Sequence, residues 1–234
     1  MRSASYPGSR TVGAWVGATL IGTLIGAALT LTLTPVLEDW VRFHWTLWPG
    51  LGGGDFAARA TSAFVAGTAL AAPQAFVLGR RLRRIEIAWL TASVVASLIA
   101  FLIPFGTLLY SPGRIGDLPG QAVQPSPILY PLVYGVSAGA LYGAAQTIVF
   151  WRYVRGAMWW ILASTFAYGL AALASALVNW EIAGAGYRST TLADFYWEAT
   201  AGSLIQGLIV GLVTGLALVH LMMKSEPRTA RAPT

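Results

Sequence analysis

The sequence GALYGAAQ, residues 139–146, lies inside a long apolar run and combines two glycines four residues apart with a glutamine. Lipid supplies no hydrophobic force between helices, so membrane helices associate through small residues that allow close backbone contact. A glutamine in that environment needs a hydrogen-bond partner. This stretch therefore predicts a tightly packed membrane helix with a buried polar side chain.

The composition of the whole chain also indicates a membrane protein. Of its 234 residues, 56% are hydrophobic and 10% are charged, whereas soluble domains carry about 25% charged residues. We expect six apolar membrane helices, at residues 12–37, 57–78, 87–109, 128–150, 159–178 and 199–223. The predicted fold class is all-α: a polytopic membrane protein whose residues 1–234 form a single transmembrane domain.

The basic residues predict the orientation of the chain in the membrane. Eleven of the 15 Lys and Arg residues flank one side of the predicted helices: Arg2, Arg10, Arg80, Arg81, Arg83, Arg84, Arg152, Arg155, Lys224, Arg228 and Arg231. The positive-inside rule places this side, with both termini and the tail at 224–234, in the cytoplasm of a bacterial-type cell. The net charge of +6 is thereby explained by topology, and we expect no nucleic-acid partner. Residues 38–56, 111–127 and 179–197 are expected to form outer loops.

The motif that ends at Gln146 recurs in the second and the sixth predicted helix. The three copies align without gaps as Ala63-Gly67-Ala71-Gln74, Gly135-Gly139-Gly143-Gln146 and Ser203-Gly207-Gly211-Thr214. Small residues every four positions form a flat stripe on one helix face, which favours close helix packing. We therefore expect Gly67, Gly135, Gly139, Gly143, Gly207 and Gly211 to be helix-packing residues.

A second motif opens the other three predicted helices. It pairs an arginine with a tryptophan five residues later, at Arg10 and Trp15, Arg84 and Trp89, and Arg155 and Trp160. We interpret these pairs as cytoplasmic anchors, with Arg among the headgroups and Trp at the membrane boundary. The two motifs together predict three copies of one helical hairpin, at 10–78, 84–150 and 155–223, in a pseudo-threefold bundle.

Gln74, Gln146 and Thr214 form the candidate polar cluster inside the membrane. If they converge near a common axis, they can bond one another, backbone carbonyls or a bound polar group. Two roles remain open for them: hydrogen bonds that hold helices together, or a polar binding or passage site. Thr19, Ser93 and Ser164, four residues after each tryptophan, are expected to bond carbonyls of their own helices.

Two motifs of the chain resemble those of known groups of membrane proteins. The repeated Gly-x3-Gly-x2-Gln hairpins resemble a loose group of small bacterial polytopic membrane proteins, over most of the second to fifth helices, and this implies no activity. Gly135-Val136-Ser137-Ala138-Gly139 resembles the motif of rhomboid proteases, which are six-helix enzymes. That family's histidine would fall at Leu204 here, and His220 lies about 20 Å from Ser137 in depth. The resemblance therefore gives no catalytic pair.

The sequence is rich in packing features and poor in reactive groups. It has no cysteine, two histidines and no carboxylate within a predicted membrane core, so we expect no enzyme activity, metal or cofactor. The expected function is that of an accessory or assembly subunit of a membrane complex, whose partners are the lipid bilayer and other membrane proteins. The alternative is a small-solute channel, carrier or substrate-binding membrane subunit.

Overall fold

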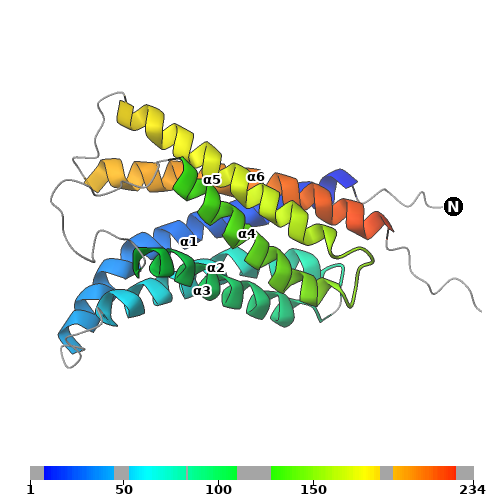
Figure 1. Ribbon diagram of the computed structural model, residues 1–234. Coiled ribbons are helices and arrows are strands. Elements are labelled where there is room, and N and C mark those ends of the chain that lie inside the picture. The colour runs from blue at the N-terminus through cyan, green and yellow to red at the C-terminus, as the bar shows by residue number, and fades with distance from the viewer. Residues whose placement is uncertain (1–7, 45–52, 83, 110–127, 185–191, 225–234) are drawn as a thin grey trace, which may run out of the picture.

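The computed structural model describes residues 8–44, 53–82, 84–109, 128–184 and 192–224. Their secondary structure is helical, and no strand occurs among them. The helices are α1 (Gly8–His44), α2 (Gly53–Gly79), α3 (Glu86–Leu109), α4 (Leu129–Phe150), α5 (Trp159–Gly184) and α6 (Leu192–Lys224) (Figure 1). The prediction of an all-helical chain with six helices is confirmed.

Several helices extend beyond the apolar runs that predicted them. Residues 38–44, 53–56, 179–184 and 192–197 were expected in outer loops, but they continue α1, α2, α5 and α6. Hydrophobicity marks the part of a helix that lies in lipid, whereas backbone hydrogen bonding can continue beyond it. Residues 111–127, the predicted middle loop, and most of the tail lie outside the described residues.

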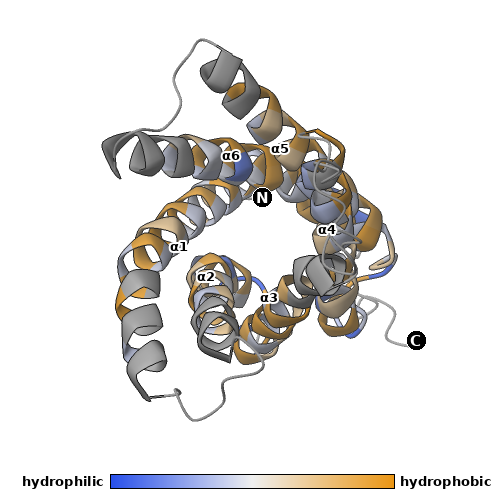
Figure 2. Cartoon of the chain, turned by 60° about the vertical axis from the view of Figure 1, so that its left-hand side comes forward, coloured by the Kyte–Doolittle hydropathy of each residue, from blue (hydrophilic) through white to orange (hydrophobic). Residues whose placement is uncertain are grey.

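Five helices are long and apolar enough to cross a membrane. Their apolar stretches are Gly8–Leu33, Ala60–Gly79, Pro131–Phe150, Trp159–Val178 and Thr200–Lys224. The corresponding stretch of α3 is shorter, Glu86–Phe101, over the residues searched. Hydrophobic residues predominate along the helices (Figure 2), and all six helices carry exposed large hydrophobic side chains. These features are compatible with a multi-pass membrane protein.

The helices form a closed ring. Each helix contacts the helices before and after it in the chain, and α6 contacts α1. Among the described residues, the backbones of helices that are not neighbours in the ring do not approach one another, so contact across the centre is made by side chains. The start of α1, the end of α6, and the α2–α3 and α4–α5 turns lie at the same end of the bundle (Figure 1). We call this the basic end, because it carries Arg10, Arg80, Arg81, Arg84, Arg152, Arg155 and Lys224.

Glycines bring neighbouring helices of the ring into backbone contact. A Cβ atom added at Gly139 would lie 2.6 Å from the Ser164 carbonyl oxygen, and one at Gly143 would lie 2.7 Å from the Ile161 Cα. At the other glycines of the stripe the nearest atom of the neighbouring helix would also lie within 3.0 Å; it is a backbone atom at Gly211 and a side-chain atom at Gly67, Gly135 and Gly207. A side chain at any of these positions would force the helices apart.

We predict that Gly139→Leu destabilises the protein severely, by about 3 kcal/mol or more, because the side chain must displace the backbone of α5. Thermal unfolding in detergent, followed by circular dichroism, measures the effect. Gly17→Leu is the matched control, since a Cβ at Gly17 meets nothing within 4 Å. Equal losses of stability in the two variants would contradict the role assigned to the stripe.

Candidate functional site

The three polar residues predicted inside the membrane are buried near the basic end. Gln74 in α2, Gln146 in α4 and Thr214 in α6 are 4%, 5% and 3% exposed. No hydrogen bond joins any two of them; their partners are tryptophan side chains, hydroxyl groups and one carbonyl. The possibility that they bond one another is therefore not realised.

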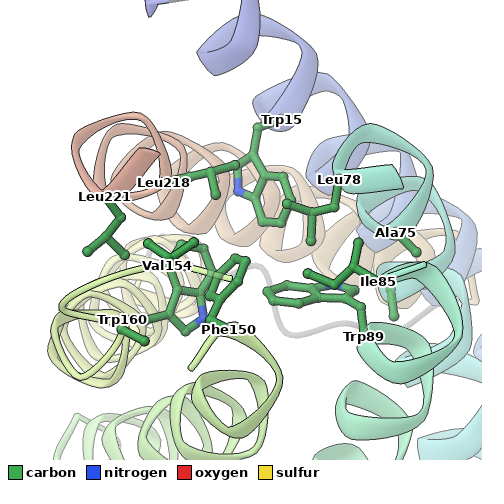
Figure 3. Close-up of a cluster of buried hydrophobic side chains, with 12 residues drawn as sticks. Trp15, Ala75, Leu78, Ile85, Trp89, Phe150, Val154, Trp160, Leu218 and Leu221 are labelled. Carbon is green, nitrogen blue, oxygen red and sulfur yellow. The ribbon is translucent and has the colours of Figure 1, made fainter. Parts of the chain in front are cut away.

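The structure corrects the placement of the three tryptophans. Trp15, Trp89 and Trp160 were expected at the membrane boundary, but their exposed fractions are 0%, 0% and 1%. Each follows its arginine by five residues and lies on the face of its helix that points to the centre of the ring (Figure 3). The arginines Arg10, Arg84 and Arg155 are exposed at the basic end, so their anchoring role stays a prediction.

Each tryptophan donates its indole N–H to one polar residue of the preceding helix in the ring. Trp160 Nε1 lies 2.8 Å from Gln146 Oε1. Trp89 Nε1 lies 3.4 Å from Gln74 Oε1, and Trp15 Nε1 lies 2.9 Å from Thr214 Oγ1. A buried indole N–H usually finds a partner, and the bonds link α5 to α4, α3 to α2, and α1 to α6.

The three indole rings contact one another edge to face at the centre of the ring (Figure 3). Their centroids are 5.7, 5.9 and 5.8 Å apart, with interplanar angles of 75°, 80° and 67°. Edge-to-face pairs add about 0.5–1.5 kcal/mol each beyond the area they bury. Three further side chains, four residues after the polar positions, complete what we call the tryptophan layer: Leu78, Phe150 and Leu218. This layer fills the centre of the bundle near its basic end with protein.

The two glutamines each make a second hydrogen bond, to a hydroxyl on another neighbouring helix, and Thr214 makes no such bond between helices. Gln74 Nε2 donates to Thr19 Oγ1 at 3.0 Å, and Gln146 Nε2 donates to Ser93 Oγ at 2.9 Å. Thr214 is too short to reach across, and its hydroxyl donates instead to the Val210 carbonyl of its own helix. Ser164 corresponds to Ser93; it is 1% exposed, and its hydroxyl has no hydrogen-bond partner among the described residues.

These bonds form a network, here called the Trp–Gln network, that joins neighbouring helices around the ring. It links α6 with α1, α2 with α3, and α4 with α5 through the indoles, and α1 with α2 and α3 with α4 through the glutamine amides. Over the part of the chain that the structure describes, α5 and α6 are the neighbouring pair without a link of this kind. Of the three hydroxyls expected to bond their own helices, Thr19 does so, to the Trp15 carbonyl.

A second buried layer lies further from the basic end, and the sequence motifs did not predict it. Tyr142 and Tyr168 stack with their ring centroids 5.2 Å apart, beside Leu70, Ala96 and Val210. Leu70, Tyr142 and Val210 each precede the polar residue of their helix by four positions. That common spacing is the signal that could have identified the layer.

The chemical repertoire of the described residues is narrow. They contain no group of three or more His, Cys, Asp or Glu side chains that could hold a metal ion. Ser137 is half-buried on α4 whereas His220 is exposed on α6 near the basic end, as the sequence comparison with rhomboid proteases anticipated. The arrangement can hold helices together through hydrogen bonds and aromatic contacts.

The chain was compared with protein-family models, with curated proteins and with solved structures, and no match was found in any of the three.

We predict that Ser93→Ala and Ser164→Ala have different effects. Ser93→Ala should lower the free energy of unfolding by about 1 kcal/mol, because the amide of Gln146 loses its acceptor. Ser164→Ala should leave stability unchanged or raise it, because the hydroxyl that is removed has no partner. Thermal unfolding in one detergent compares the two, and equal destabilisation would contradict the asymmetry of the network.

The converse change tests the same asymmetry. Thr214→Gln places an amide where it can accept from Trp15 and donate to Ser164, and we expect a gain in stability of about 1 kcal/mol. Adding Ser164→Ala should remove this gain. A gain that persists without the Ser164 hydroxyl would have another cause.

Proposed function

We propose that the protein is a non-enzymatic integral membrane protein that serves as an accessory or assembly subunit of a membrane complex. The observation that carries this proposal is the Trp–Gln network. Gln74, Gln146 and Thr214 are at most 5% exposed, and the indole of a tryptophan occupies an acceptor atom of each. Because these polar groups are buried and hydrogen-bonded to other helices, they hold the helices together and have few free donors or acceptors for a solute.

The finer architecture is part of the proposal. The bundle would have six membrane spans, arranged as three hairpins at 10–78, 84–150 and 155–223 about a pseudo-threefold axis. The similar indole distances support this, as do the contacts of glycines with the following hairpin: Gly67 with Ser97, Gly139 with Tyr168, and Gly207 with Thr23. The 24 residues of α3 measure about 36 Å as a helix, enough for a sixth span.

The proposed orientation puts the basic end in the cytoplasm of a bacterial-type cell, with both termini on that side. Among the described residues that end carries seven Lys and Arg side chains and one carboxylate, Glu86. Such an excess of basic residues next to membrane helices is characteristic of cytoplasmic loops.

The orientation can be tested with single cysteines, since the chain has none of its own. We expect Leu82→Cys, in the α2–α3 turn, to react with a membrane-impermeant maleimide only after the cells are permeabilised. Asp117→Cys, in the segment between α3 and α4, should react in intact cells. Labelling of position 82 from outside would reverse the proposed topology.

If the protein is a subunit of a complex, a second membrane protein should co-purify with it in a fixed molar ratio. Protein extracted in a mild detergent should carry a second membrane protein in stoichiometric amount, measured by quantitative mass spectrometry against an unrelated membrane protein with the same tag. Gln74→Leu with Gln146→Leu should lower the melting temperature, while the molecules that remain folded keep the partner.

The alternative, a small-solute channel or carrier, predicts a different outcome for the same double variant. Its melting temperature would stay unchanged, and the uptake of a solute into vesicles that contain the protein would be lost. That pair of results would overturn the proposed function.

A further inference from the structure

Arg80 occupies an unusual position at the basic end. It follows the last residue of α2, Gly79, yet its guanidinium turns back and lies 4.4 Å from the centre of the Phe76 ring. Phe76 is 61% exposed on the outer surface of the bundle. Four residues correspond to about 6 Å along a helix. The cation is therefore held on the outward face, toward the apolar part of the molecule.

Two more arginines lie next to it on the α2–α3 turn. Arg81 Nη2 is 3.4 Å from the hydroxyl of Thr11 on α1. Arg84 is exposed and has a φ of 66°, a left-handed conformation that residues with a Cβ atom rarely adopt. Within the described part of the chain, no ion pair joins a carboxylate to Arg80, Arg81 or Arg84.

We propose that this turn binds the headgroup of an anionic phospholipid, with its phosphate among Arg80, Arg81 and Arg84 and an acyl chain alongside Phe76. Guanidinium groups bind phosphate through paired hydrogen bonds. Clusters of basic residues beside membrane helices attract anionic lipids by about 1 kcal/mol per residue. The ring of Phe76 holds one guanidinium where the headgroup and the acyl chain meet, so a ligand with both parts fits better than free phosphate. The inference goes beyond the proposed role as a subunit and does not depend on it.

The other turn at the basic end provides an internal control. Arg152 follows Gln146 by six residues, as Arg80 follows Gln74, but the position that corresponds to Phe76 is Ile148. Ile148 is 73% exposed and has no aromatic face on which a guanidinium could lie. If lipid binding requires a guanidinium held against an aromatic ring, replacing Arg80 should weaken binding and replacing Arg152 should not. If any exposed arginine suffices, the two replacements should have the same effect.

The test measures the binding of a fluorescent phosphatidylglycerol to the purified full-length protein in a zwitterionic detergent. Arg80→Gln should weaken binding about five-fold and Phe76→Leu about two- to five-fold. Arg152→Gln should change it less than two-fold. Unchanged melting temperatures would show that the variants fold.

Two competitors distinguish the sources of the phosphate group. Unlabelled phosphatidylglycerol should displace the probe, whereas inorganic phosphate and phosphatidylcholine should not. The proposal fails if Arg152→Gln weakens binding as much as Arg80→Gln, which would indicate diffuse attraction to all basic residues. It also fails if inorganic phosphate competes as well as the lipid, because the ligand would then be free phosphate.

Discussion

An indole N–H buried in a membrane protein needs an acceptor, and water does not provide it there. Trp15, Trp89 and Trp160 bring three such donors to the centre of this protein, and each finds an oxygen on the helix next to its own. The hydrogen bond sets the depth of one helix relative to the other, while the glycines set their separation. The three indole side chains are large, and the closed ring of helices leaves room for them at its centre.

The same constraint explains why one link differs from the others. A glutamine has an acceptor for the indole and a donor for a hydroxyl on the neighbouring helix, so it joins three helices at once. The Thr214 hydroxyl still accepts from the Trp15 indole, but its side chain is too short to reach Ser164. The Ser164 hydroxyl is therefore buried without a hydrogen-bond partner among the described residues. Among the described residues, the pair α5 and α6 therefore lacks the amide bond that joins α1 to α2 and α3 to α4. An unpaired buried hydroxyl costs about 1–3 kcal/mol, which makes this the weakest point of the network.

Much of this arrangement could be predicted from the sequence, because membrane helices are marked by length and hydrophobicity. The six helices, the packing stripe and the burial of Gln74, Gln146 and Thr214 all follow from local patterns. The tryptophans were assigned to the boundary because tryptophan near basic residues usually lies there. The Arg–Trp spacing indicates which end of the helix the tryptophan is near, but it does not tell whether the ring faces lipid or the centre of the bundle. The sequence does contain three indole donors and three acceptors at fixed spacings, but which donor meets which acceptor depends on how distant helices pair. The outer helix ends were missed because hydrophobicity ends before the helices do.

The closure of the ring has a consequence for the synthesis of the chain. Trp15 is made first among the tryptophans, and its acceptor, Thr214, follows 199 residues later. A ribosome that adds about 5–20 residues per second needs about 10–40 s to cover that distance. In the membrane protein proposed above, the first helix enters the bilayer during that time while its indole and its contact surface for α6 lack their final partners. The insertion machinery, lipid headgroups or a transient companion helix must cover them until the last helix arrives.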